Sequence, residues 1–217
     1  MKLINSEFTS IFKNNFLTEN MAIVLYGMMK TIRPLKLLEF GYGYTTPFLL
    51  EAIKDIKEEL TPYNEIVKTD THDNYSGTKY NPELVVVDNL LDIDGEQFAK
   101  DFKNMEMLSL SNNMTLVKSD MKDYIQNCNE KYDLIWIDAG PKKDYIDYFK
   151  HIDNMINDGG LIIVHSTLTN VEGKEFLRQF NNSNYEKLSL LEPHKKWQNS
   201  FTLLKRKTEY PTYTEIA

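Results

Sequence analysis

The chain has 217 residues, and its 25 Lys and Arg against 32 Asp and Glu give a formal net charge of −7, which disfavours nucleic acid as a partner. An apolar fraction of 41% predicts one domain with a sizeable core, and no apolar run approaches the ~18–20 residues of a membrane span. The single cysteine, Cys128, excludes a disulfide framework. Because the N-terminus also lacks a continuous signal-peptide core, the sequence predicts a cytoplasmic protein, and no contact with a membrane is expected.

The chain divides into three parts. Segment 1–34 is expected to form one or two helices that cap the substrate side of the main domain, which spans 35–207. The polar tail 208–217 is expected to be loose or to serve as an oligomer arm. Within the main domain, short apolar runs alternate with segments of helical spacing. The expected strands are 35–40, 84–88, 114–118, 132–138 and 161–165, and the expected helices include 47–60 and 144–157.

This alternation predicts an α/β fold of the Rossmann-like, doubly wound kind, in which helices cover both faces of a parallel sheet. Two further strand-like pieces, 185–191 and 200–205, have no helix between them. They are therefore expected to pair as an antiparallel hairpin. The result is a mostly parallel, seven-stranded sheet with an antiparallel strand near the C-terminus.

The most informative segment reads Leu38-Glu39-Phe40-Gly41-Tyr42-Gly43-Tyr44-Thr45-Thr46-Pro47. A strand that runs into Gly-x-Gly and then into a helix is typical of a mononucleotide-binding turn, since glycine lets the backbone approach a ligand closely. Thr46 stands where a pyrophosphate site usually has a third glycine. The Glu39 carboxylate beside the turn would repel phosphate and attract an ammonium or sulfonium group. Together these features favour an adenosyl amino acid over NAD or ATP.

The segment resembles the first motif of the class I S-adenosylmethionine (SAM) methyltransferases, which has the form E-x-G-x-G. The resemblance extends over nearly the whole chain. It implies SAM as cofactor, S-adenosylhomocysteine (SAH) as product, and cofactor contacts from the acidic residue and the loop that follows it. These residues are Glu39, Gly41, Tyr42, Gly43, Tyr44 and Thr45.

The resemblance also implies roles for carboxylates at three later strand ends. Asp88 would accept hydrogen bonds from the ribose hydroxyls, because one carboxylate can accept from two donors. Asp120 would hold the adenine amino group, with Met121 against the ring, and Asp138 would lie beside the reacting sulfonium. The alternative for each aspartate is an N-cap of the following helix.

One departure from the family is the distance between the first motif and the ribose carboxylate. From Gly43 to Asp88 there are 45 positions, against ~20 in the usual pattern. The excess is the polar insertion 61–82, which we expect to fold over the ligand or substrate, although simple surface decoration is the alternative. The tyrosines expected to contact substrate are Tyr63, Tyr75 and Tyr80.

Segment 132–170 looks most like the small-molecule branch related to catechol O-methyltransferases. In the metal-dependent members, an Asp after the fourth strand and Asp-Asn after the fifth hold Mg²⁺, and a nearby lysine deprotonates the substrate. This chain keeps Asp138 but has His165-Ser166 after the fifth strand. One carboxylate and an imidazole form a poor site for Mg²⁺, which prefers hard oxygen ligands. No metal is therefore expected.

Without a metal, the acceptor needs a base. His165 is the candidate, beside Asp138, because imidazole titrates near neutral pH and ligands bind at the carboxyl ends of strands. A purely structural role at a crowded strand end is the alternative for His165. Lys142 and Lys143 are out of register with the family's lysine and are expected to be solvated.

The resulting prediction is a metal-independent SAM-dependent methyltransferase that acts on an O or N nucleophile of a small molecule and forms a possible homodimer. His194 and Trp197 would border the acceptor pocket if the sixth strand is parallel to the first five. The main alternative is a SAM-consuming lyase or cyclase on the same scaffold. Methylation of RNA or protein with a partner, and SAM binding without chemistry, also stay open.

Overall fold

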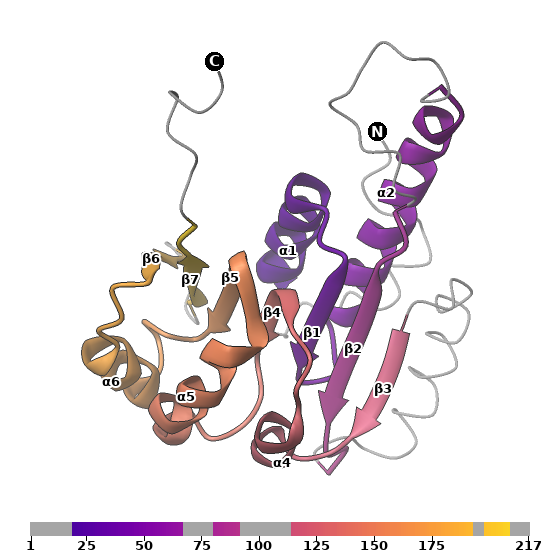
Figure 1. The fold of residues 1–217 in the computed structure, drawn as a ribbon. Coiled ribbons are helices and arrows are strands. Elements are labelled where there is room, and N and C mark those ends of the chain that lie inside the picture. The colour runs from indigo at the N-terminus through magenta and orange to yellow at the C-terminus, as the bar shows by residue number, and fades with distance from the viewer. Residues whose placement is uncertain (1–18, 67–79, 92–113, 193–197, 209–217) are drawn as a thin grey trace.

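The structure is a computed structural model that describes residues 19–66, 80–91, 114–192 and 198–208. In these residues seven strands form one sheet, in the order β3-β2-β1-β4-β5-β7-β6 (Figure 1). The strands are β1 (Lys36–Phe40), β2 (Glu83–Asp88), β3 (Met114–Lys118), β4 (Tyr132–Ile137), β5 (Ile156–His165), β6 (Tyr185–Leu191) and β7 (Ser200–Arg206). The helices are α1 (Glu19–Ile32), α2 (Thr46–Ile66), α4 (Met121–Asn127), the short η2 (Lys142–Asp144), α5 (Tyr145–Met155) and α6 (Val171–Gln179).

The sheet confirms the predicted fold class. Strands β1 to β5 are mutually parallel, and β7 is antiparallel to both β5 and β6. Two antiparallel pairings in succession make β6 parallel to β1–β5, so the end of β6 points to the same edge as theirs. This edge carries the carboxyl ends of six strands, where ligands bind in open α/β sheets.

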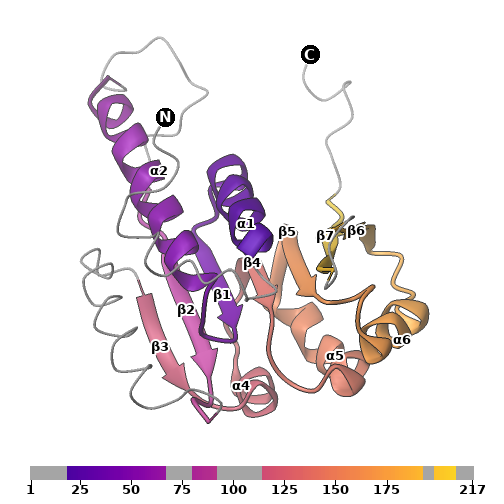
Figure 2. The ribbon, with the colours of Figure 1, turned by 180° about the vertical axis from the view of Figure 1, so that it is seen from behind.

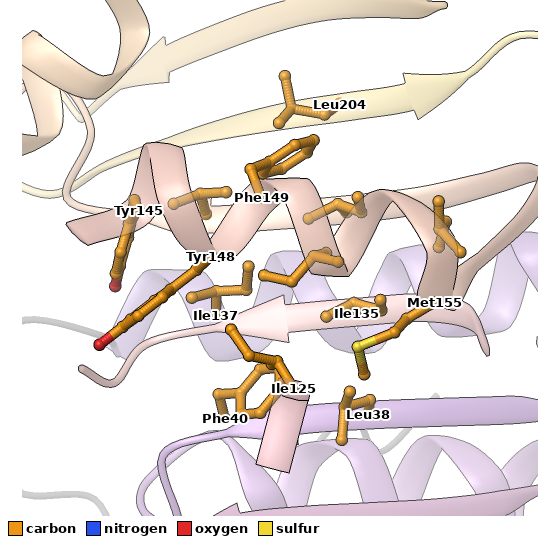
Figure 3. Packing of buried hydrophobic residues seen from close by; sticks show 14 of the residues in the cluster. Leu38, Phe40, Ile125, Ile135, Ile137, Tyr145, Tyr148, Phe149, Met155 and Leu204 are labelled. Atoms are coloured by element: carbon orange, nitrogen blue, oxygen red, sulfur yellow. The ribbon is translucent and has the colours of Figure 1, made fainter. Parts of the chain in front are cut away.

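Side chains alternate between two hydrophobic clusters, one on each face of the sheet. In β1, Leu37 packs with α1 and α2, whereas Leu38 and Phe40 pack with α4 and α5. Helices α1 and α2 lie side by side (Figures 1 and 2). On the other face, aromatic and aliphatic side chains of α5 lie over β1 and β4 (Figure 3). Helices therefore cover both faces of the sheet, and the parallel strands end at one common edge.

Two element boundaries differ from the predicted ones. The helix after the first motif continues to Ile66, so the first residues of the predicted insertion 61–82 are helical. The second difference lies at 156–160, where the strand β5 begins directly after α5, although the strand was expected to begin at 161. The pairing of β5 with β4 shifts register here, and Gly159 takes a left-handed φ of 73°. The two glycines at 159–160 therefore mark an irregular strand start.

Tyr80 lies at the edge of the sheet opposite the strand carboxyl ends, which corrects its predicted place among the substrate contacts. It precedes β2, the residue is 7% exposed, and its hydroxyl donates to the carbonyl of Pro34 at 3.2 Å. Its apolar ring completes the core around β1 and β2. Tyr75, His194, Trp197 and the side chain of Tyr63 lie outside the described residues.

Helix α1 is part of the main core. Met21, Leu25 and Met29, spaced four residues apart, are buried against the same cluster as α2 and β4. The role of segment 1–34 as a cap on the substrate side stays a prediction. None of the helices in the described ranges is both long and apolar enough to cross a lipid bilayer.

Candidate functional site

A cavity of about 770 Å³ opens at the carboxyl ends of β1, β2, β3 and β4. A volume of this size suits a nucleoside-sized ligand. Residues from all four strand ends line it, and nine of the ten predicted cofactor residues are among them. These nine are Gly41, Tyr42, Gly43, Tyr44, Thr45, Asp88, Asp120, Met121 and Asp138.

The first glycine of the motif lets the loop after β1 approach the end of β4. Gly41 has a φ of 101°, a left-handed value that other residues rarely adopt, and its N–H donates to the carbonyl of Val87 at 3.0 Å. A Cβ at this position would lie 2.9 Å from the carbonyl oxygen of Asp138. Only glycine therefore fits both the conformation and the space.

The carboxylate of Asp88 holds the glycine loop in place. It accepts hydrogen bonds from the backbone N–H of Tyr42 at 2.8 Å and of Leu90 at 2.6 Å. Neither bond is an N-cap of a helix, which was the alternative role for this residue. Each carboxylate oxygen has a second lone pair, and Asp88 lines the cavity, so it retains the capacity to accept from a ligand.

Asp120 also faces the cavity without capping a helix. It occupies the N-cap position of α4, but its side chain makes no capping hydrogen bond. Instead it accepts from the Asn89 side-chain amide at 2.9 Å. The next residue, Met121, is 6% exposed and also lines the cavity. Both residues therefore line the cavity, and their contacts with adenine stay a prediction.

Glu39 lies behind the glycine loop instead of in the cavity. It is fully buried, and its Oε1 accepts from the Thr45 hydroxyl at 2.5 Å, while Oε2 has no partner in the described part of the chain. Burial raises the pKa of Glu39 to about 8. At neutral pH this side chain is therefore mostly uncharged, which differs from the expected charged carboxylate beside the turn.

The negative charge of the cavity comes from aspartates. Besides Asp88, Asp120 and Asp138, the lining includes Asp123 and a single lysine, Lys122. Such a cavity attracts a cation and repels a phosphate, as the sequence predicted, but through residues at strand ends and not through Glu39.

At the end of β4, Asp138 meets His165 from β5. The Nδ1 atom of His165 lies 2.5 Å from Oδ1 of Asp138, and its Nε2 atom lies 3.2 Å from Oδ1 of Asn199. The side chain of Asp138 is 25% exposed and faces the cavity, whereas that of His165 is 7% exposed and lies behind it. The two predicted catalytic residues are therefore in contact, with the carboxylate in front. Asn199 was not predicted, because 34 residues separate it from His165.

Lys142 is not the solvated residue that the sequence suggested. Its Nζ atom lies 3.5 Å from the hydroxyl of Tyr145 and 5.3 Å from the centre of that ring. Burial lowers the pKa of Lys142, against the attraction of the Asp138 and Glu172 carboxylates. The neighbouring Lys143 is exposed, as expected.

Several lining residues were missed by sequence reasoning. They are immediate neighbours of predicted ones, so extending each strand-end position by two or three residues would have found most of them. They are Asn89, Ser119, Lys122, Asp123, Ala139, Gly140 and Pro141, together with Val87 and, from α5, Tyr148.

A comparison with family models supports this interpretation. Residues 38–167, more than half of the chain, match a family described as a methyltransferase domain. The chain belongs to this family. The match begins at the glycine motif and ends just after His165, so it covers every strand end that lines the methyltransferase cavity. No curated protein matches the sequence.

Solved structures share the fold of this methyltransferase. An O-methyltransferase from Bacillus cereus in complex with SAH has a TM-score of 0.66 at 15% identity, over 94% of this chain and 92% of that one. The O-methyltransferase TomG from Streptomyces achromogenes, in complex with SAM, has a TM-score of 0.63 at 13% identity, over 94% and 91%. An rRNA methylase from Streptococcus thermophilus has a TM-score of 0.54 at 9% identity, over 91% and 100%.

The resemblance to class I SAM-dependent methyltransferases is thereby confirmed, together with the Rossmann-like fold. The described residues fit the cofactor of this class on three observations. The turn at Gly41 has no room for a side chain, carboxylates converge at the strand ends, and the cavity between them is large enough. Similarity at such low identity shows the fold and leaves the acceptor open.

Proposed function

We propose that this protein transfers the methyl group of SAM to an oxygen or nitrogen nucleophile of a small molecule, without a metal ion. The observation that carries the proposal is the contact between Asp138 and His165 at the edge of the aspartate-lined cavity. It supplies a proton acceptor where the metal-dependent branch of the family has its ion. The O-methyltransferases with a similar fold support an acceptor of this class.

The donor set at the strand ends does not fit Mg²⁺. Asp138 Oδ1 is engaged by the imidazole of His165, and His165-Ser166 occupies the place where the metal-dependent relatives have Asp-Asn. In the described ranges no group of three or more His, Cys, Asp or Glu side chains could hold an ion. Mg²⁺ prefers six oxygen ligands in octahedral geometry, so the ligand chemistry of these residues supports a metal-independent reaction.

When bound, SAM supplies an electrophilic methyl group on a positively charged sulfur. The residues of the chain then have two tasks. The cavity holds the acceptor in line with the methyl group, which is worth several kcal/mol through orientation alone. The Asp138–His165 pair takes up the acceptor's proton as the O–H or N–H bond breaks and the new bond to carbon forms, which contributes ~10²–10⁴-fold.

The test is turnover of SAM to SAH with a panel of small phenols and amines. We expect His165→Ala to lower turnover by about 10²-fold, while SAH affinity stays within about twofold of wild type. His151→Ala, which removes the exposed histidine of α5, is the matched control and should behave as wild type. Unchanged turnover in His165→Ala would exclude the pair as the base.

The same assay tests the other parts of the proposal. Turnover should be insensitive to EDTA; a loss that Mg²⁺ restores would contradict metal independence. A product formed from SAM with no acceptor present would favour a lyase or cyclase instead.

A homodimer is also part of the proposal, because the edge strand β6 exposes Leu188, Leu190 and Leu191. Light scattering measures it directly.

A further inference from the structure

A second hollow lies beside the cofactor cavity, between η2, the start of α5 and α6. It has a volume of about 500 Å³, which suits a small molecule. Pro141 lines the cofactor cavity and Lys142, the next residue, lines this groove, so the two spaces share the wall formed by residues 141–142. The β4 end with Asp138, where the acceptor's nucleophile must be placed, lies three residues before that wall.

The groove is basic in an acidic protein. Four of its lining side chains are cationic and two are anionic, whereas the whole chain carries a net charge of −7. The Arg178 guanidinium and the Glu175 carboxylate neutralise each other at 2.6 Å. In the described residues, neither Lys143 nor Lys174 forms an ion pair, and both side chains are exposed. Two cations are therefore available to an anion that enters the groove.

The groove also offers apolar surface. Val171, at the start of α6, is 83% exposed, and the lining also includes the half-buried Ile146 of α5 and the edge of the buried Phe176 of α6. The groove therefore offers apolar surface next to the two exposed lysines. The combination fits an occupant with a flat or aliphatic body and one negatively charged group.

We propose that this groove binds the methyl acceptor, and that the acceptor is a small organic anion whose carboxylate contacts Lys143 and Lys174. Its apolar body lies on Val171 and Ile146, and its nucleophile points past Lys142 to Asp138. The inference rests on the proposed methyl transfer to a small molecule, and it adds the charge of the substrate and the residues that recognise it.

The test compares two probes that differ by one carboxylate, catechol and 3,4-dihydroxybenzoate, by calorimetry in the presence of saturating SAH. The carboxylate probe should bind on the order of tenfold more tightly, because charge-assisted contacts to two lysines add to the apolar contact. The double variant K143Q/K174Q should abolish this difference. The control K131Q/K150Q removes two lysines outside the groove and should retain it, and SAH affinity should be unchanged in all proteins.

Equal affinity of the two probes for the wild-type protein, no binding of either, or the same loss in both double variants would overturn the inference. Binding is measured without chemistry, so it separates this inference from the proposed function. If the carboxylate probe binds through Lys143 and Lys174 but no methyl transfer follows, the groove is supported as an anion-binding site and the proposed reaction is wrong. If methyl transfer occurs equally with neutral and anionic acceptors, the proposed reaction is supported and the assignment of the groove as the acceptor site is wrong.

Discussion

Gly41 shows how one residue can fix the position of a ligand-binding loop. It is the residue at which the chain leaves β1, and both its φ of 101° and the nearby Asp138 carbonyl exclude a side chain. The second glycine of the motif, Gly43, has no heavy atom within 4 Å of the place where a Cβ would lie, and its φ is not left-handed. The backbone conformation therefore requires glycine at position 41 but not at position 43, although both positions are glycine in the sequence motif.

This difference predicts opposite outcomes for two alanine substitutions. Gly41→Ala should lower the free energy of unfolding by about 1–3 kcal/mol, because it forces a strained φ and a contact with backbone. Gly43→Ala should change it by less than about 1 kcal/mol. Urea denaturation of the two variants measures both values. Equal destabilisation would show that the loop does not hold Gly41 in the conformation described.

The site residues divide into those that sequence could predict and those that it could not. Asp88, Asp120 and Asp138 were predictable, because each directly follows an apolar strand and parallel strands end at one edge. The protonation of Glu39 was not, because it depends on α2 covering β1, a contact that no local pattern contains. The same holds for Asn199, which reaches His165 through the β6–β7 hairpin.

At the scale of the elements, the strands followed from the sequence to within a few residues, apart from the early start of β5, because each is an apolar run bounded by polar residues. The end of α2 did not, since Pro62 is a residue that normally ends a helix, yet the helix continues past it to Ile66. The helix and strand propensities of the residues also do not determine how closely two elements pack. Gly173, near the start of α6, illustrates it. A Cβ there would lie 2.6 Å from the carbonyl oxygen of Ser166 and 3.0 Å from Cα of Thr167.

A pair of helical glycines tests this packing. In α1, Gly27 has open space around its Cα, so Gly27→Ala should stabilise the protein by about 0.5–1 kcal/mol through helix propensity alone. Gly173→Ala gains the same propensity but must push α6 away from the 166–167 turn, and should destabilise by about 1–3 kcal/mol. Thermal unfolding ranks the two variants. A stabilised Gly173→Ala would contradict the close approach of α6 to the end of β5.

At the scale of the whole molecule, the buried carboxyl of Glu39 couples folding to pH. Its pKa rises from the ordinary value of 4.5 to about 8 in the folded protein, chiefly because burial disfavours the charged form. The folded state therefore holds a proton that the unfolded state releases between these two values. The stabilising contribution is complete below about pH 4.5 and is lost as the pH rises towards 8.

The variant Glu39→Gln isolates this effect, because the amide does not titrate. The free energy of unfolding of the wild-type protein, minus that of Glu39→Gln, should fall as the pH rises from 5 to 8, by up to about 1 kcal/mol per pH unit. Glu58→Gln removes an exposed carboxylate of α2 and controls for the change in net charge. Urea denaturation at four pH values gives the three curves. Parallel curves for wild type and Glu39→Gln would mean that Glu39 is charged in the folded protein, and the cavity would then have an additional negative charge behind its glycine loop.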